Sequence, residues 1–201
     1  MPNDEGLKKF ERTLKDLLSW FKAAKTRGVV IGGIAVGLIG RPRLTEDVDA
    51  LVFLEEEQWD SFIHLGSQFG FRPRISDPLI FADKNRVLLM HHRPSGYAVD
   101  ISLGALPFEE EAIKRCTRIR LGSVALPIPT PEDLVIMKAI AHRPRDWEDI
   151  RTILDAHPRL DLRRINRWVK QFAEILENSE IFLDLKKIIG EKAKEEKRRK
   201  T

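Results

Sequence analysis

The stretch that decides the fold runs from Val29 to Leu54 and reads VVIGGIAVGLIGRPRLTEDVDALVFL. It opens with three β-branched residues, 29–31, which favour a short buried strand. Gly32 and Gly33 follow at once, and an apolar run continues to Ile39. A strand that meets a helix at a glycine corner leaves backbone N–H groups exposed at the helix start, where phosphate binds. The sequence therefore predicts a phosphate seat at the glycine pair.

Two aspartates stand on the next predicted strand, with Asp47 and Asp49 flanking Val48. Because side chains on a strand alternate between its faces, we expect both carboxylates on one face and Val48 in the core. Neighbouring carboxylates repel each other, and hard cations that prefer oxygen ligands, Mg²⁺ above all, remove that penalty. A phosphate seat beside a divalent-metal seat indicates phosphoryl or nucleotidyl transfer.

The order of these elements resembles the signature of the polymerase-beta-type nucleotidyltransferase superfamily: a glycine pair, a short helix and an Asp-x-Asp strand. A fuller set is similar to the AbiEii-type toxin nucleotidyltransferases and their uncharacterised relatives: Gly32, Gly33, Arg43, Thr45, Asp47 and Asp49. Each element alone has an ordinary explanation, since glycine pairs make turns and paired acids line solvated strand faces. Their order and spacing together favour the nucleotidyltransferase interpretation.

The resemblance implies an α+β fold, with a nucleotidyltransferase core followed by a C-terminal helical bundle. We expect the core, a short mixed β-sheet flanked by helices and preceded by an N-terminal helix, in residues 1–129. The helical region with its basic tail then occupies residues 130–201.

Local patterns predict the individual elements. Apolar spacing predicts helices and alternation predicts strands, with turns at Gly, Pro and Asp. Thr130 is a natural N-cap before Pro131. The predicted helices are 7–25, 55–69, 109–114, 134–141, 160–176 and 181–189, and the predicted strands are 79–82, 86–91, 97–103 and a β pair within 117–126. A turn at 83–85 joins the first two of these strands.

A third carboxylate stands on the strand 97–103, where Asp100 lies between Val99 and Ile101. The superfamily carries a third acid on a neighbouring strand, and Asp100 is the position that matches it. In the family this residue is the base, or third metal ligand, that readies the attacking hydroxyl. The alternative is an edge-strand aspartate that faces water.

A lone lysine interrupts the next apolar helix, which is apolar from Leu134 to Ala141 except at Lys138. A buried ammonium must extend to solvent or meet an anion, and we expect Lys138 to meet phosphate. The array of Lys138, Arg145, Asp146 and Asp149 resembles the third motif of the AbiEii-type family, which lines the nucleotide pocket. Asp146 is also predicted to cap the next helix, and the two acids to hold Arg145 or Lys138 in place.

The resemblance also implies a mechanism. Gly32 and Gly33 hold the β- and γ-phosphates of a nucleoside triphosphate, with Arg43 near phosphate and Thr45 shaping the loop. Asp47 and Asp49 bind two Mg²⁺ ions, or Mn²⁺ in their place, and Asp100 binds the metal that carries the acceptor hydroxyl. The acceptor in the resembled family is tRNA or another cellular target, and similar cores modify proteins or small molecules. A toxin would have an antitoxin protein as partner.

Composition places the chain among globular proteins of a reducing compartment. Of 201 residues, 42% are hydrophobic and 33% charged, with Cys116 as the single cysteine. A cytoplasmic location fits, since no disulfide can form and the first residues do not read as a secretory signal. No apolar run approaches the ~20 residues needed to cross a bilayer, so no membrane partner is expected.

Two other functions compete with catalysis. One is a nucleotidyltransferase-like module that binds a nucleotide or partner without chemistry. The other is RNA binding through the tail, since residues 186–200 carry eight Lys/Arg and three Glu, a net of +5 against +4 for the whole chain. A basic tail suits an RNA backbone, although a solvated helix end explains the same charges.

Overall fold

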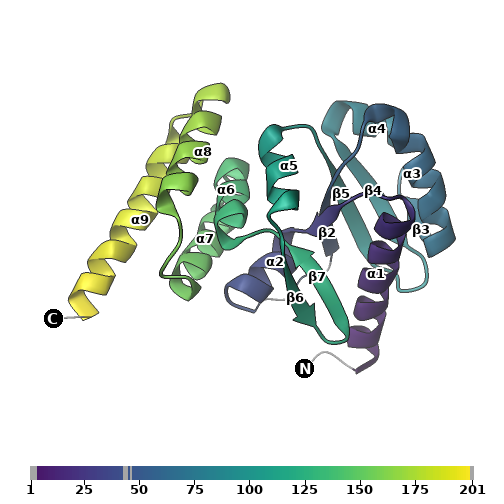
Figure 1. Ribbon diagram of the computed structural model, residues 1–201, viewed down its shortest axis with the longest axis horizontal. Coiled ribbons are helices and arrows are strands. Elements are labelled where there is room, and N and C mark those ends of the chain that lie inside the picture. The colour runs from purple at the N-terminus through teal and green to yellow at the C-terminus, as the bar shows by residue number, and fades with distance from the viewer. Residues whose placement is uncertain (1–3, 43–44, 46, 200–201) are drawn as a thin grey trace. The chain divides into compact units, whose positions relative to one another are not determined.

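The computed structural model describes residues 4–42, Thr45 and 47–199. These residues form two compact units, one of residues 4–35, Thr45 and 47–129, the other of residues 36–42 and 130–199 (Figure 1). The first unit contains α1 (Asp4–Ala23), β1 (Gly28–Val30), β2 (Asp47–Phe53), η1 (Glu56–Gln58), α3 (Trp59–Gly66), η2 (Ser67–Phe69), β3 (Phe71–Pro73), α4 (Pro78–Asn85), β4 (Val87–His92), β5 (Ala98–Gly104), α5 (Pro107–Lys114), β6 (Thr117–Leu121) and β7 (Val124–Ile128). The unit boundary falls inside α2 (Gly32–Ile39), and the second unit continues with α6 (Pro131–Ala141), α7 (Pro144–Ala156), α8 (Leu162–Ile175) and α9 (Glu180–Arg199).

A five-stranded mixed sheet organises the first unit. Its order is β1-β2-β5-β4-β3, with β2 and β5 parallel and the other neighbours antiparallel. A separate two-stranded sheet pairs β6 with β7. This mixed sheet with flanking helices, followed along the chain by further helices, confirms the α+β fold class expected from the sequence.

The two faces of the large sheet differ in burial. One face is closed to solvent and is made of small and branched apolar side chains, all 0% exposed: Val48, Ala50, Val52, Leu88, Met90, Val99 and Ile101. Helices α1 and α3 cover this face, where the Trp20 ring stacks on Phe62 and Phe71 with centroids 4.3 and 5.0 Å apart. The opposite face is buried at Val29 and Leu51, but it also carries residues that are exposed or half-buried: Asp47, Asp49, Arg72, Leu89, His91, Ala98 and Asp100. We call this second surface the open face.

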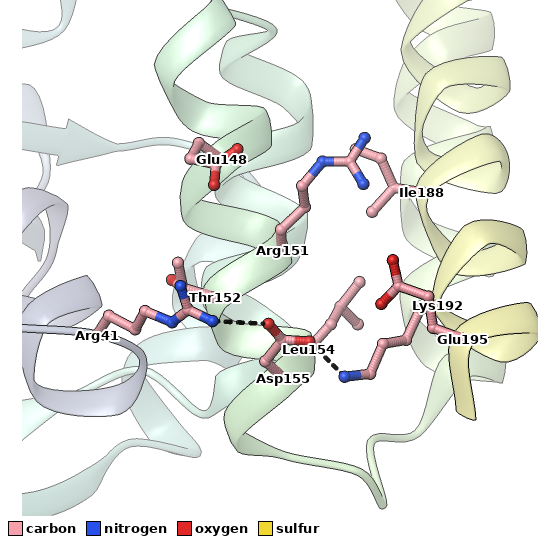
Figure 2. Close-up of a pocket in the computed structure, with 9 residues that line it drawn as sticks. All are labelled: Arg41, Glu148, Arg151, Thr152, Leu154, Asp155, Ile188, Lys192 and Glu195. Carbon is pink, nitrogen blue, oxygen red and sulfur yellow. Dashed lines mark hydrogen bonds and ion pairs between the residues drawn. The ribbon is translucent and has the colours of Figure 1, made fainter. Parts of the chain in front are cut away.

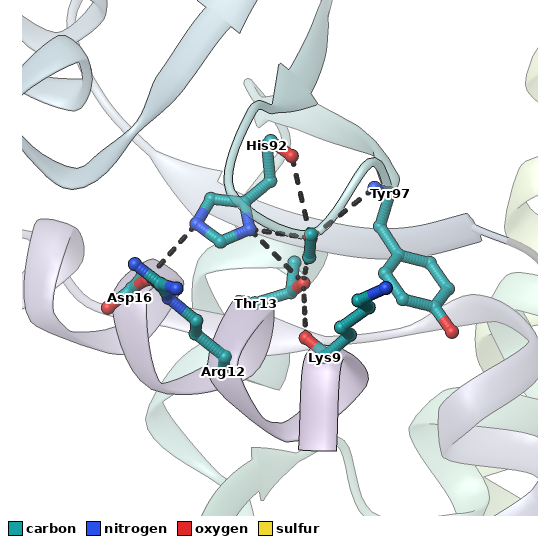
Figure 3. A network of polar contacts seen from close by, with 7 residues as sticks. Lys9, Arg12, Thr13, Asp16, His92 and Tyr97 are labelled. Carbon is teal, nitrogen blue, oxygen red and sulfur yellow. Dashed lines mark hydrogen bonds and ion pairs between the residues drawn. The ribbon is translucent and has the colours of Figure 1, made fainter. Parts of the chain in front are cut away.

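A polar network fastens α1 to the hairpin between β4 and β5 (Figure 3). The His92 ring is fully buried, and its Nε2 lies 3.0 Å from Asp16 Oδ2. Its Nδ1 lies 2.7 Å from Ser95 Oγ, which in turn is 2.6 Å from Thr13 Oγ1. Burial lowers the pKa of His92 below its ordinary value, and the Asp16 charge opposes that shift. These contacts join helix and sheet because each buried polar atom finds a partner there.

The second unit is helical and contains buried ion pairs. Thr130 caps α6 by accepting a hydrogen bond from the Asp133 N–H at 3.2 Å, as the Thr-Pro sequence predicted. The Asp133 carboxylate, itself fully buried, accepts a hydrogen bond from Arg164 Nε at 2.8 Å and so links α6 to α8. Paired burial of this kind avoids the large cost of an isolated internal charge.

Two local predictions were wrong. The segment 79–82 is not a strand, because α4 runs from Pro78 to Asn85 and includes the turn expected at 83–85. Pro78 is preorganised for the first helical turn, and Ile80 is 60% exposed, which defeats the alternation of a buried strand. Asp146 does not cap α7, since that helix begins at Pro144 with Arg143 at the N-cap.

No helix of the described residues is both long enough and apolar enough to span a bilayer.

Candidate active site

Strand pairing brings the second and third predicted acids together on the open face. The parallel register of β2 and β5 places Asp49 opposite Asp100, and it places Asp47 one pleat earlier, opposite Ala98. Alternation along β2 keeps Asp47 on the same face as Asp49 while Val48 is fully buried. Three carboxylates from two neighbouring strands therefore share one face of the sheet.

The glycine corner lies directly against this group. Gly32 begins α2 with φ +62°, and a methyl group added there would lie 1.8 Å from Asp49 Oδ2. The Ile31 N–H donates to the Asp49 carbonyl at 2.9 Å, which fixes the end of β1 beside β2. The first N–H groups of a helix have no carbonyl partner within it, so Gly32 and Gly33 offer donors next to the acids.

The third acid, Asp100, forms an ion pair with an arginine that the sequence analysis did not indicate. The Arg74 guanidinium donates to Asp100 Oδ1, and the two side chains are 34% and 33% exposed. Burial raises the pKa of Asp100 above its ordinary value, the Arg74 charge works against that rise, and the Asp47 charge adds to it. The only available signal was the spacing of Arg72, on β3, and Arg74, just after it, since side chains two apart in an extended segment share a face.

Thr45 orients the first acid. Its Oγ1 donates to Asp47 Oδ1 at 2.8 Å and to the Asp47 carbonyl at 3.1 Å. This hydroxyl therefore holds the Asp47 carboxylate at the start of β2, which agrees with a role in shaping the loop that enters the strand. Arg43, expected near phosphate, lies outside the described residues.

The donor chemistry of the open face suits a hard divalent cation, because carboxylate oxygens are what Mg²⁺ prefers. Within residues 4–42, 45 and 47–199, no three Asp, Glu, His or Cys side chains converge closely enough to form a metal site. The cation that Asp100 contacts in this structure is the guanidinium of Arg74. The three acids are of the residue type that a metal ion prefers and share one face, but their carboxylates do not converge in this structure, and Arg74 pairs with one of them.

The lysine predicted to meet phosphate has carboxylate partners in the second unit. Lys138 is 5% exposed, and its Nζ lies 2.7 Å from Asp146 Oδ1 and 2.9 Å from Asp149 Oδ2. The two acids thus hold Lys138, as the sequence suggested. Arg143 rather than Arg145 completes the cluster, through a 2.6 Å contact of its Nε with Asp146 Oδ2.

Electrostatics of this cluster favour its charged state. Burial would raise the pKa of Asp146, but the hydrogen bonds and charges of Arg143 and Lys138 outweigh it and lower the pKa below its ordinary value. Arg145 is exposed on α7 and is not among the hydrogen-bond partners of Asp146. Whether Lys138, Arg145 or Asp146 contacts a nucleotide stays a prediction.

A pocket in the second unit is lined by α7 and α9 side chains of both signs (Figure 2). Asp155, one of the lining residues, pairs with Arg41 at 3.3 Å and with Lys192. Its volume of about 150 Å³ is below the roughly 300 Å³ at which small-molecule sites begin. The pairing and the size both favour a solvated ion-pair network over a nucleotide pocket.

The class that this fold defines is the nucleotidyltransferase fold. The solution structure of the antibiotic-resistance factor ANT(2'')-Ia matches this chain with a TM-score of 0.58 at 14% sequence identity, over 84% of this chain and 94% of that one. A crystal structure of ANT(2'')-Ia with adenylyl-2''-tobramycin gives 0.56 at 14% identity, over 83% and 99%. An antigenic nucleotidyltransferase-like protein from Paracoccidioides brasiliensis gives 0.50 at 14% identity, over 87% and 91%. At this identity the likeness establishes the fold. No protein-family model matches the chain, and no curated protein matches it.

Proposed function

We propose that the chain is a metal-dependent nucleotidyltransferase that moves a nucleoside monophosphate from a nucleoside triphosphate to an acceptor hydroxyl and releases pyrophosphate. The observation that carries the proposal is the open face itself. Asp49 lies in register with Asp100, shares its face with Asp47, and touches the Gly32 corner. An anion seat beside paired carboxylates is the arrangement that phosphoryl chemistry needs, since catalysis there is mostly positioning and charge neutralisation.

From the order of strands we infer a side of the sheet for each reactant. The glycine corner follows β1 at one edge of the sheet, the acids stand on β2 and β5, and β4 and β3 lie beyond Asp100. The triphosphate would lie against the N–H groups of Gly32 and Gly33, and the acceptor over β4 and β3. Asp100, between the two, would act on the acceptor hydroxyl either as its base or through the metal that it holds.

Asp47, Asp49 and Asp100 would hold the metal, two Mg²⁺ ions or Mn²⁺ in their place, with Thr45 fixing Asp47 by its hydrogen bond. Bound there, such ions would neutralise phosphate charge and lower the pKa of the acceptor hydroxyl. Within this proposal, residues 1–129 are the catalytic core and 130–201 the helical region. In the helical region, Lys138, Arg145 and Asp146 are the residues that we propose contact the nucleotide.

The resemblance to AbiEii-type toxin nucleotidyltransferases extends the proposal to an acceptor such as tRNA or protein, and to a toxin held in check by an antitoxin. The alternative acceptor is a small molecule, since the crystal structure of the similar protein ANT(2'')-Ia contains adenylyl-2''-tobramycin. We place the reaction in the cytoplasm, which suits the free thiol of Cys116.

The test is label transfer from each of the four α-labelled nucleoside triphosphates, with Mg²⁺, to total cellular RNA, to a protein extract and to tobramycin. Asp49→Asn should abolish pyrophosphate release while the fold survives, because the change keeps the size of the side chain and removes its charge. Asp60→Asn on α3, an exposed acid, is the matched control and should keep full activity. Undiminished pyrophosphate release by Asp49→Asn would refute the proposed role of the acids.

A second candidate function is a nucleotide- or partner-binding module without catalysis. The observation that favours it is the Arg74 ion pair, which occupies the third acid. Calorimetric titration of ATP, GTP, CTP and UTP with and without Mg²⁺ separates the two functions. Nucleotide binding that ignores Mg²⁺, without pyrophosphate release, supports the module.

A further inference from the structure

The backbone places Arg74 in line with the acids across four strands. The Arg74 N–H donates to the Leu89 carbonyl at 2.8 Å, Leu89 on β4 is in register with Asp100, and Asp100 is in register with Asp49. Directly opposed residues of neighbouring strands share a face. The row therefore runs from the edge of the sheet into the centre of the open face, and the Arg74 side chain follows it to the Asp100 carboxylate.

The guanidinium at Asp100 competes with any other cation there. An arginine stays charged at every ordinary pH and donates in a fixed fork that matches a carboxylate. A divalent ion that approached the same oxygens would be repelled by that charge at close range. Both side chains are one-third exposed, so solvent weakens the pair and leaves the guanidinium room to move away.

We propose that Arg74 is the resident counter-ion of Asp100 and that a divalent metal binds at the three acids only when Arg74 leaves. A triphosphate on the Gly32 corner supplies an anion that the released guanidinium can pair with, so nucleotide and metal bind cooperatively. Arg74 is a positioning residue in this scheme. The inference rests on the proposed function, because it assumes a metal at Asp100.

A matched control lies two residues away. Arg72 stands on β3, is exposed and shares the open face, since it is opposite His91, which is opposite Ala98. Among the described residues its side chain makes no hydrogen bond or ion pair, and only its backbone pairs with β4. Removing Arg72 therefore subtracts one positive charge from the same face and leaves Asp100 as it was.

The experiment measures Mn²⁺ binding by electron paramagnetic resonance on the full chain, without nucleotide. Arg74→Ala and Arg74→Gln should bind Mn²⁺ about three- to fivefold more tightly than the wild type, the upper end of what a partly exposed ion pair contributes. Arg74→Lys should stay near the wild type because it keeps the charge, and Arg72→Ala should change affinity by less than about twofold. A non-hydrolysable triphosphate analogue should tighten Mn²⁺ binding more in the wild type than in Arg74→Ala.

Unchanged or weaker Mn²⁺ binding in both Arg74→Ala and Arg74→Gln, with native circular dichroism, would overturn the inference. An equal gain in Arg72→Ala would overturn it as well, since the effect would then be one of net charge. Tighter Mn²⁺ binding by the Arg74 variants with no pyrophosphate release by the wild type would keep the inference and overturn the proposed function.

Discussion

Lys138→Met is the perturbation whose cost the structure defines most closely. The ammonium is buried in an ion cluster, where its Nζ lies 2.7 Å from the Asp146 carboxylate and 2.9 Å from the Asp149 carboxylate. Methionine has a similar length and no charge, so the change removes the pairing and little of the volume. Two carboxylates that are 1% and 5% exposed then lose their shared cation.

Breaking a buried pair by removing one partner costs about 3–5 kcal/mol, because the remaining charge stays buried. Arg143 still contacts Asp146 from α7, so we expect the lower end, about 3 kcal/mol. For a chain of this size that corresponds to a fall in Tm of roughly 6–12 °C. We therefore expect a large destabilisation from the loss of one buried charge.

Urea unfolding followed by circular dichroism measures the difference in free energy of unfolding. Lys170→Met is the matched control, since Lys170 forms an exposed 3.8 Å pair with Glu174 and should cost less than about 0.5 kcal/mol. Adding Asp149→Asn to Lys138→Met should recover part of the loss, because one uncompensated charge is then removed. A cost for Lys138→Met no larger than that of the control would refute the argument.

Two further changes test the glycine corner and the histidine network. Gly32→Ala should destabilise the chain and abolish calorimetric nucleotide binding, because the added methyl group would meet Asp49. Gly96, at φ +84°, faces open space, so Gly96→Ala should cost only about 1–2 kcal/mol, from left-handed backbone strain. Equal losses of unfolding free energy in urea for the two variants would contradict the close approach of Gly32 to Asp49. Burial holds the pKa of His92 in the folded chain below its ordinary value of about 6.5. As the pH falls, the unfolded chain therefore takes up a proton at this histidine first. The contribution of neutral His92 to the unfolding free energy is thus complete above about pH 6.5 and is lost as the pH falls toward the folded-state pKa. His92→Gln should flatten the fall in unfolding free energy between about pH 7.5 and 5.5, whereas His64→Gln, on an exposed part of α3, should leave the slope as it is.

Parts of this molecule could be predicted because their causes are local. Alternation alone puts Asp47 and Asp49 on one face, and Thr130 before Pro131 specifies a helix start. Local patterns also misled where they were short, as at 79–82, where apolar residues after a proline suited a strand or a helix equally. There the helix forms, with only Ala82 buried among its residues.

Other parts depend on which strands pair, and pairing is not written in any one segment. Asp100 was identified by resemblance, but its place beside Asp49 comes from the parallel register of β2 and β5. Arg74 reaches Asp100 because β3, β4 and β5 are neighbours, which no spacing along the chain expresses.

The sequence by itself determined the strand–glycine–helix corner, the common face of Asp47 and Asp49, and the burial of the helix around Lys138, since each follows from periodicity and backbone preference over a few residues. Only the tertiary structure decided which charges meet: Arg74 with Asp100, and Lys138 with Asp146 and Asp149. The physical reason is that a buried charge requires a partner without specifying one, and the partner is chosen by chain packing between residues far apart in sequence or on different helices.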